Sequence, residues 1–168
     1  MQRWKRDLDS TLGLLKRLTE AGVDFVVVGG MAAAAYGSAL VTDDVDVCVV
    51  LDAQNISRIL RALEGTHPRQ RMRPDRPPLS ADSAAYVGFK NLHVVTDFGQ
   101  LDFLGEITGI GGFAEVTKGA ETLDLGGFNC RVVSLENLIK AKRTLARPKD
   151  LRAAAELEHV LARRGTRK

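Results

Sequence analysis

Cysteine, aromatic residues and long apolar runs are all scarce in this chain of 168 residues, of which 5% are aromatic. Its two cysteines, Cys48 and Cys130, are too few for a disulfide framework and lack metal-ligand spacing. The longest apolar stretch, residues 23–35, is interrupted by Gly29 and Gly30 and is shorter than the roughly 20 residues of a membrane span. We therefore expect neither a disulfide-stapled protein nor a membrane-spanning one.

The amino terminus, MQRWKRDLDS, lacks the apolar stretch of a signal peptide, so a cytoplasmic location is expected. Hydrophobic residues make up 45% and charged residues 27% of the chain, proportions that exclude wholesale disorder. The length suits one domain. We expect that domain to span residues 1–168, with its core at about 23–133 and a helical carboxyl-terminal part at about 134–164.

Charge is distributed unevenly along the chain, although the net charge is only +3. Residues 65–80 carry a net charge of +3 and residues 134–168 carry +6, while residues 81–133 carry −4. An acidic region between basic ones suits metal ions together with a polyanion. The alternative is that the basic segments only keep a small protein in solution.

Hydrophobic spacing predicts helices alternating with strands. Helices are expected at 2–21, 31–36, 53–63, 135–145 and 150–163. Strands are expected at 23–28, 44–51, 91–96, 100–107, 121–125 and 129–133. The proline-rich and arginine-rich segment 65–83 and the glycine-rich segment 108–119 are expected to be loops. This order predicts an α/β (α+β) domain with a mixed sheet of about five to six strands flanked by helices.

Carboxylates on the predicted strands form the first candidate site. Asp44 and Asp46 point to the same face of a strand, about 7 Å apart, and repel each other unless a cation lies between them. Asp102 lies in the middle of another strand, where an unpartnered charge is costly. Glu106 and Asp97 are weaker candidates. Oxygen ligands of this kind suit Mg²⁺, and the alternative is a set of solvated carboxylates at the ends of loops.

Gly29 and Gly30 follow a predicted strand and open a predicted helix, where backbone N–H groups can approach a phosphate. The segment GGMAAAAYG matches neither the Rossmann fingerprint nor the Walker loop. Ser38 and Thr42, between the glycines and the aspartates, could contact phosphate through their hydroxyls, or could cap a turn instead. The pairing of a double glycine with Asp-x-Asp on the next strand is the informative feature.

Two segments carry a family resemblance. VVVGGMAAAAYGSALVTDDVDVCV resembles the signature of the nucleotidyltransferase superfamily related to DNA polymerase β. Within that superfamily it is similar to the small prokaryotic group of AbiE-type toxins and minimal nucleotidyltransferases, although Leu40 stands where an arginine is usual. VVSLENLIKAKRTLARPKDLRAAAEL resembles the later part of the same group, with matches at Lys142, Lys149 and Asp150. Ala153 stands where a second acidic residue is common.

The resemblance implies a nucleotidyltransferase fold and transfer of a nucleoside monophosphate from a nucleoside triphosphate (NTP), with Mg²⁺ as cofactor and Mn²⁺ as the alternative. Asp44 and Asp46 would hold two metal ions. Asp102 would hold the catalytic ion and help to accept the proton of the attacking hydroxyl. This chemistry depends mainly on positioning and charge stabilisation.

The remaining implied roles concern the nucleotide and the acceptor. Backbone N–H groups near Gly29 and Gly30 would bind the triphosphate, and Lys142 would offset the charge of its β- and γ-phosphates. The acceptor would be a tRNA 3′ end or a partner protein, as in toxin–antitoxin systems, or an antibiotic hydroxyl. A catalytically silent binding module or antitoxin is the alternative. A cluster of arginines either binds acceptor phosphates or forms a solvated loop: Arg69, Arg71, Arg73 and Arg76.

Overall fold

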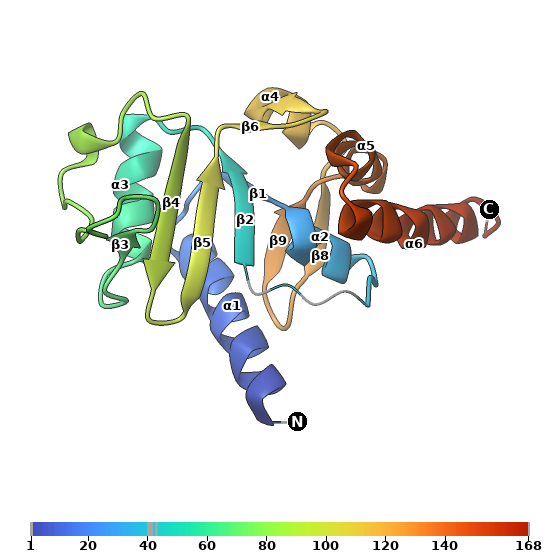
Figure 1. The fold of residues 1–168 in the computed structure, drawn as a ribbon, viewed down its shortest axis with the longest axis horizontal. Coiled ribbons are helices and arrows are strands. Elements are labelled where there is room, and N and C mark those ends of the chain that lie inside the picture. The colour runs from blue at the N-terminus through green and yellow to red at the C-terminus, as the bar shows by residue number, and fades with distance from the viewer. Residues whose placement is uncertain (1, 40–41, 43, 168) are drawn as a thin grey trace.

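The structure is a computed structural model that describes the backbone of residues 2–39, 42 and 44–167, and the side chains among them from residue 11 onward. In this part of the chain, seven strands form one mixed sheet in the order β3-β4-β5-β2-β1-β9-β8 (Figure 1). The strands are β1 (Phe25–Val28), β2 (Asp44–Val49), β3 (Arg69–Gln70), β4 (Asn91–Thr96), β5 (Gly99–Leu104), β8 (Glu121–Asp124) and β9 (Asn129–Val132). A separate hairpin consists of β6 (Glu106–Ile107) and β7 (Gly111–Gly112).

The helices are α1 (Gln2–Glu20), α2 (Gly29–Ala35), α3 (Ala53–Ala62), α4 (Phe113–Thr117), α5 (Leu135–Leu145) and α6 (Pro148–Gly165), with a 3-10 turn, η1 (Ser83–Ala85). The predicted class, a mixed sheet flanked by helices, is confirmed, and the sheet is larger than the predicted five to six strands.

The additional strand, β3, lies in the segment predicted to be a loop. Arg69 and Gln70 pair antiparallel with Val95 and Val94 of β4. The other predicted loop, residues 108–119, contains β7 and α4. Two-residue strands carry too little hydrophobic pattern to be recognised locally, because their stability depends on the strand beside them.

The predicted strand over 100–107 is divided in two at Gly105. A Cβ atom added at Gly105 would lie 2.6 Å from the backbone oxygen of Lys90, so the chain passes very close to a neighbouring backbone there. The sheet ladder of β5 ends at Leu104, and Glu106 begins the separate hairpin. A glycine inside a strand pattern often marks such a close approach.

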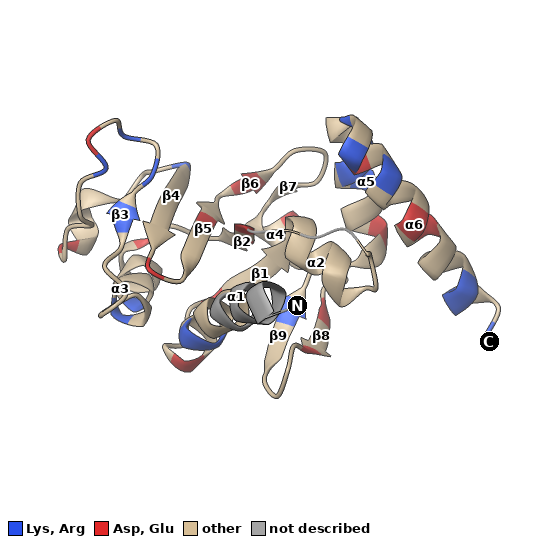
Figure 2. Cartoon of the chain, turned by 60° about the horizontal axis from the view of Figure 1, so that its bottom comes forward, with Lys and Arg blue, Asp and Glu red and all other residues tan. Residues whose placement is uncertain are grey.

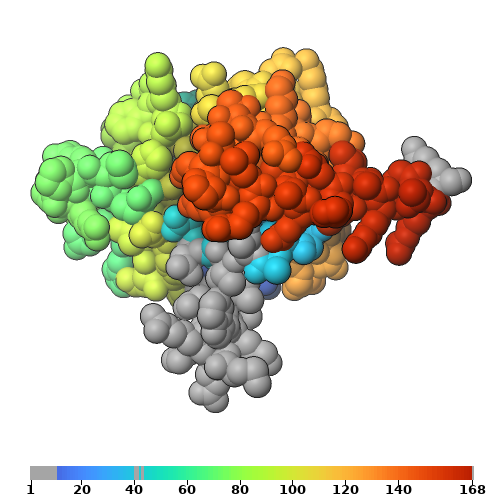
Figure 3. All heavy atoms as spheres, turned by 45° about the vertical axis from the view of Figure 1, so that its right-hand side comes forward, coloured from blue at the N-terminus to red at the C-terminus, as the bar shows by residue number. Residues whose placement is uncertain are grey.

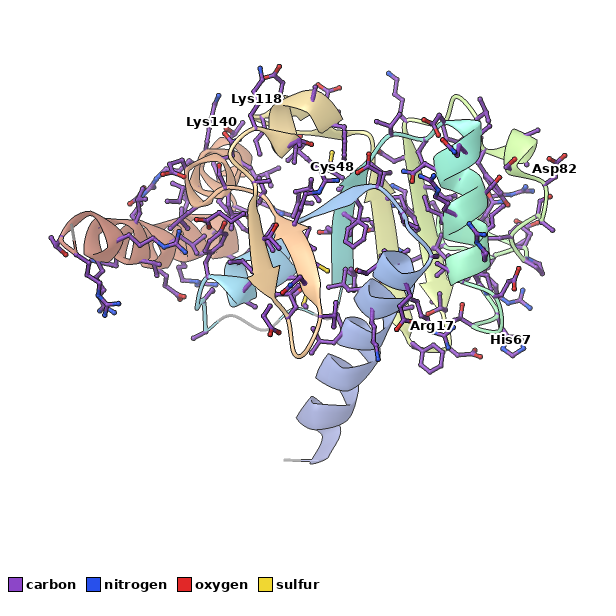
Figure 4. The ribbon with its side chains drawn as sticks, turned by 180° about the vertical axis from the view of Figure 1, so that it is seen from behind. Arg17, Cys48, His67, Asp82, Lys118 and Lys140 are labelled. Atoms are coloured by element: carbon purple, nitrogen blue, oxygen red, sulfur yellow. The ribbon has the colours of Figure 1, made fainter. Side chains whose placement is uncertain are left out.

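Helices α1 and α3 cover one face of the sheet, which is the face toward the viewer in Figure 4. Leu14, Leu15 and Leu18 of α1 are buried in the core, and α1 contacts β2, β5 and α3. The opposite face of β4 and β5 has no described helix in front of it in Figure 1. One face of these strands is therefore buried in the core, and the other face is accessible.

Helices α5 and α6 pack against each other beside α2. The side chain of Ser134 caps α5 by accepting a hydrogen bond from Asn137 N at 3.1 Å. Ala146 adopts a left-handed conformation, with φ at 54°, and Pro148 starts α6. The sharp turn between α5 and α6 brings Lys142, Arg147 and Lys149 next to the start of β2.

None of the described helices is both long enough and apolar enough to cross a membrane.

Candidate active site

The strand register brings the predicted carboxylates together. β2 and β5 are parallel neighbours, with Asp46 directly opposite Asp102 and Asp44 opposite Gln100. β1 lies on the other side of β2, where Val28 pairs with Asp46. As predicted, the alternating residues of β2 and β5 on the other face are fully buried, and the aspartates are only partly so. Three carboxylates therefore share one face of two adjacent strands.

A pocket of about 190 Å³ lies between these strands and the carboxyl-terminal helices. In Figure 3, the orange and red atoms of α5 and α6 lie directly above the blue-to-cyan atoms of the region that contains α2 and the start of β2. The pocket contains six of the predicted site residues: Gly29, Gly30, Thr42, Asp44, Asp46 and Lys142. Among the described lining residues, Asp102 and Ser38 are absent. Residues of the two motifs that are 96 or more positions apart in the sequence, such as Asp46 and Lys142, thus form one cavity.

The two glycines allow β2 to approach the turn after β1. Gly29 has φ of +64°, and a Cβ atom there would lie 2.6 Å from Oδ2 of Asp46. A Cβ atom at Gly30 would lie 2.7 Å from the Cβ of Thr42. The Thr42 hydroxyl in turn accepts a hydrogen bond from Asp44 N at 3.3 Å. Gly29 therefore permits close packing against the Asp46 side chain and Gly30 against that of Thr42, independently of any phosphate.

Asp46 lies in an environment that disfavours its charge. Burial raises the pKa of Asp46 to about 6, and repulsion from Asp102 and Asp44 adds to that effect. The charges of Lys142 and Arg71 oppose it without cancelling it. The negative charge at this position is therefore under-compensated by the protein itself.

Asp102 already has partners in the protein. Nη2 of Arg71 lies 2.6 and 2.7 Å from its two carboxylate oxygens, and Nδ1 of His93 lies 3.0 Å from Oδ1. Arg71 follows β3, and His93 of β4 pairs directly with Asp102 across the sheet. Both neighbours belong to the β3–β4 side of the sheet, on the far side of Asp102 from the pocket.

The opposite wall of the pocket is basic and is arranged around Asp150 of α6, whose side chain is 1% exposed. Arg147 Nε donates to Asp150 Oδ2 at 2.5 Å, and Lys142 Nζ lies 3.6 Å from Oδ1. Burial alone would raise the pKa of Asp150, but the Arg147 hydrogen bond and the charges of Arg147 and Lys142 bring it below its usual value. Lys149 also lines the pocket. One buried carboxylate thus holds two cations at the cavity.

Three other sequence candidates have different surroundings. Ser38 Oγ donates to Glu156 Oε2 of α6 at 3.1 Å. Asp97 lies 2.5 Å from Nδ1 of His67 in an exposed pair. Glu106 lines a separate cavity beyond the end of β5. Two positions in the aspartate motif, Leu40 and Asp43, lie outside the described residues.

Two of the three predicted carboxylates, those of Asp44 and Asp46, are suited to bind a divalent cation in this arrangement. Asp44 and Asp46 offer hard oxygen donors on one face, and the raised pKa of Asp46 reflects charge that a cation would neutralise. Within the described residues, no three Asp, Glu, His or Cys side chains converge as a ready-made ion site. Arg71 engages Asp102, so that carboxylate is available to an ion only when the arginine withdraws.

Residues 7–59 match a family described as nucleotidyl transferase of unknown function (DUF2204). The matched segment runs from α1 into α3 and includes Gly29, Gly30, Asp44 and Asp46. It covers a little under a third of the chain and does not reach Asp102 or the basic wall. No curated protein matches this sequence. The similarity supports the nucleotidyltransferase superfamily in general terms and is silent on substrate, metal and partner.

Sequence reasoning missed the roles of Arg71, His93 and Arg147. Arg71 was one arginine of a predicted loop, and His93 was one of three scattered histidines. The position of His93 in a strand was predicted, but its pairing with Asp102 depends on which strands become neighbours. Cys48 lies on β2 with its side chain fully buried (Figure 4), and burial raises the pKa of its thiol to about 11.

Proposed function

We propose that this protein transfers a nucleoside monophosphate from an NTP to a hydroxyl acceptor in a Mg²⁺-dependent or Mn²⁺-dependent reaction. The observation that carries the proposal is the pocket itself. It joins Asp44 and Asp46, of which Asp46 carries an under-compensated negative charge, to a basic wall that contains Lys142, Arg147 and Lys149. A metal-bound triphosphate needs both an anionic and a cationic wall.

The basic wall would bind the triphosphate. Lys142 and Arg147 are held by Asp150, so their charges stay at the cavity without a bound anion. Lys142 would offset charge on the β- and γ-phosphates, and backbone N–H groups near Gly29 and Gly30 would contact phosphate oxygens. Preorganised charges of this kind stabilise a transition state because they need no rearrangement during the reaction.

The carboxylates would act on the reacting centre. Asp44 and Asp46 would hold divalent ions, which supply charge neutralisation and orientation of the phosphates. Asp102 would join them and accept the proton of the attacking hydroxyl once Arg71 has moved away. The acceptor oxygen forms a bond to the α-phosphorus, the bond to the β-phosphate bridging oxygen breaks, and pyrophosphate leaves.

The acceptor classes implied by the sequence resemblance are a tRNA 3′ end and a partner protein of a toxin–antitoxin pair, and an antibiotic hydroxyl is a further alternative. A cytoplasmic location, where NTPs are abundant, belongs to the same proposal. An AbiE-type role rests on the two sequence segments and on Lys142, Lys149 and Asp150.

The test is label transfer in cell extract with each NTP labelled at either the α- or the γ-phosphate, with Mg²⁺ present. Transfer of α-label alone to RNA, protein or a small molecule is expected, and it should be abolished in Asp46→Asn. Transfer should also be reduced in Lys142→Ala, which removes a cation of the basic wall. Lys140→Ala is its matched control, because Lys140 lies on the same helix with its side chain exposed. Transfer of γ-label instead would identify a kinase and contradict the proposal.

One observation favours a second candidate, a binding module without turnover. Arg71 occupies both oxygens of Asp102, as it would in a protein that never uses that carboxylate for catalysis. Such a module would bind an NTP with the same affinity in the wild type and in Asp102→Asn. It would transfer no label in either form.

A further inference from the structure

Two groups of basic side chains lie on opposite sides of the carboxylates. The sheet order β3-β4-β5-β2-β1 places Arg71 and His93 beyond Asp102, whereas Lys142 and Arg147 lie across the pocket from Asp46. Figure 2 shows Lys and Arg positions near β3 on one side and on α5 and α6 on the other, with acidic positions on β5 and β2 between them. One triphosphate in the pocket accounts for only one of these groups.

We propose that Arg71 and His93 form a second anion subsite, which binds a backbone phosphate of the acceptor. The acceptor is then a polynucleotide whose terminal hydroxyl reaches Asp102, not a protein or an antibiotic hydroxyl. This inference rests on the proposed function and deepens it, because it selects one acceptor class from several.

The geometry of Arg71 supports this subsite. The side chains of Arg71 and His93 are 22% and 27% exposed, so both are held in place yet accessible. Nη2 of Arg71 makes the contacts to Asp102, while its Nε is buried and finds no hydrogen-bond partner among the described residues. This position of the side chain therefore leaves one donor unsatisfied, which is costly. A shift of the guanidinium onto an acceptor phosphate would satisfy that donor, because arginine forms charge-assisted pairs with phosphate oxygens.

The surface around the subsite can accommodate a chain. On the exposed face of the sheet, Arg69 pairs with Val95, which pairs with Gln100 next to the carboxylates. These side chains are partly or fully exposed, and no described helix lies in front of β4 and β5 in Figure 1. A strand of nucleic acid could therefore lie across β3, β4 and β5 with its end at Asp102.

The loop that carries Arg71 adds further positive charge. Arg73 and Arg76 are exposed, and the segment 65–80 has a net charge of +3. Arg69 Nη1 donates to the backbone oxygen of Arg76 at 2.8 Å and so links the loop to β3. Clustered arginines beside a single phosphate subsite fit a polyanion better than a small acceptor, since each additional phosphate contact adds affinity.

The chemistry of the step is unchanged. The terminal hydroxyl oxygen of the polynucleotide bonds to the α-phosphorus of the NTP, pyrophosphate leaves and the hydroxyl proton passes to Asp102. Arg71 moves from Asp102 to the adjacent phosphate, which frees the carboxylate for that proton, and Arg71 and His93 together contribute to acceptor affinity.

The test measures binding of fluorescent single-stranded RNA and DNA of about 12 nucleotides, a length within the usual site size. Titrations contain a non-hydrolysable NTP analogue and Mg²⁺, and NTP-analogue binding is measured separately. Arg71→Ala should weaken oligonucleotide binding about tenfold or more and reduce the salt-dependence slope by about one. Affinity for the NTP analogue should change less than about twofold. Comparison of the RNA and DNA arms identifies which polynucleotide is preferred.

Two further variants keep the test decisive. Arg61→Ala removes an exposed arginine on α3, which covers the opposite face of the sheet, and should leave oligonucleotide binding unchanged. His93→Gln retains the Arg71–Asp102 pair and should weaken binding about threefold to tenfold, so it decides the matter if Arg71→Ala does not fold. Nucleotide binding without oligonucleotide binding, or equal binding in all variants, would overturn this inference alone. Absence of nucleotide binding in the wild type would overturn the proposed function itself.

Discussion

At the scale of single residues, Asp46 links fold and function most closely. It is central in the sheet, opposite Asp102 and next to Val28 of β1. Its side chain lies so close to residue 29 that a Cβ atom added there would be 2.6 Å from Oδ2. A neutral residue at position 46 would suit the fold better, so the carboxylate has a cost that a bound cation would offset.

The pKa of Asp46 gives a prediction for stability. Its folded-state pKa of about 6 lies above the 3.8 that is usual for an aspartate, so the folded protein binds the proton more tightly than the unfolded chain. The free energy of unfolding should therefore fall as pH rises from about 4 through 6. Asp46→Asn should remove this loss and be more stable than wild type at pH 8 by on the order of 1–3 kcal/mol. Urea unfolding with a chelator present measures the difference, and parallel pH profiles would refute it.

Gly29 gives a second prediction, with Gly22 as a matched control. Both have positive φ, +64° and +72°, but nothing lies within 4 Å of a Cβ atom added at Gly22. Gly22→Ala should cost only the left-handed strain of about 1–2 kcal/mol. Gly29→Ala should cost at least about 1 kcal/mol more because the new methyl group meets Asp46. Equal losses in urea unfolding would mean that Asp46 moves away without cost.

At the scale of elements, the sequence was most informative where patterns are local. The period of the apolar residues predicted the main helices and strands, and alternation placed Asp44 and Asp46 on one face. The short strand β3 and the hairpin of β6 and β7 were missed, because pairing partners rather than local sequence stabilise them.

The site prediction lacked the partners of Asp102, because those partners depend on which strands become neighbours in the sheet. Asp102 was proposed as a third carboxylate, but its ion pair with Arg71 depends on β3 joining the edge beside β4. No local pattern encodes that arrangement, since it follows from packing between segments about 30 residues apart. Six of the pocket residues could be predicted because they belong to the two sequence motifs. The way in which the two motifs face each other across the pocket could not be predicted.

The contact between α6 and the segment after α2 gives a prediction at this scale. Glu156 accepts hydrogen bonds from Ser38 Oγ and from Ala39 N at 3.2 Å. Glu156→Ala should increase amide hydrogen exchange at Ala39 roughly tenfold, as expected for loss of a charge-assisted bond. Glu158→Ala is the control, because Glu158 bonds to Arg143 of α5 instead. Equal exchange at Ala39 in both variants would show that Glu156 does not hold this segment.

At the scale of the whole molecule, the charge arrangement has a clear meaning. A net charge of +3 conceals acidic strands between two basic regions, one around β3 and one on α5 and α6 (Figure 2). The strands β5 and β2 lie between these two regions. A polyphosphate in the pocket and a second anion beyond Asp102 would each meet opposite charge, which favours a two-substrate reaction over simple nucleotide binding.

The most direct test of nucleotidyl transfer is the ratio of pyrophosphate released to nucleoside monophosphate attached. With the accepted NTP, Mg²⁺ and acceptor, the wild type should release one pyrophosphate for each monophosphate attached. Asp46→Asn should be slower by on the order of 10²–10³-fold in both measurements while remaining folded. Release of inorganic phosphate instead of pyrophosphate, or equal rates in the two proteins, would contradict the account.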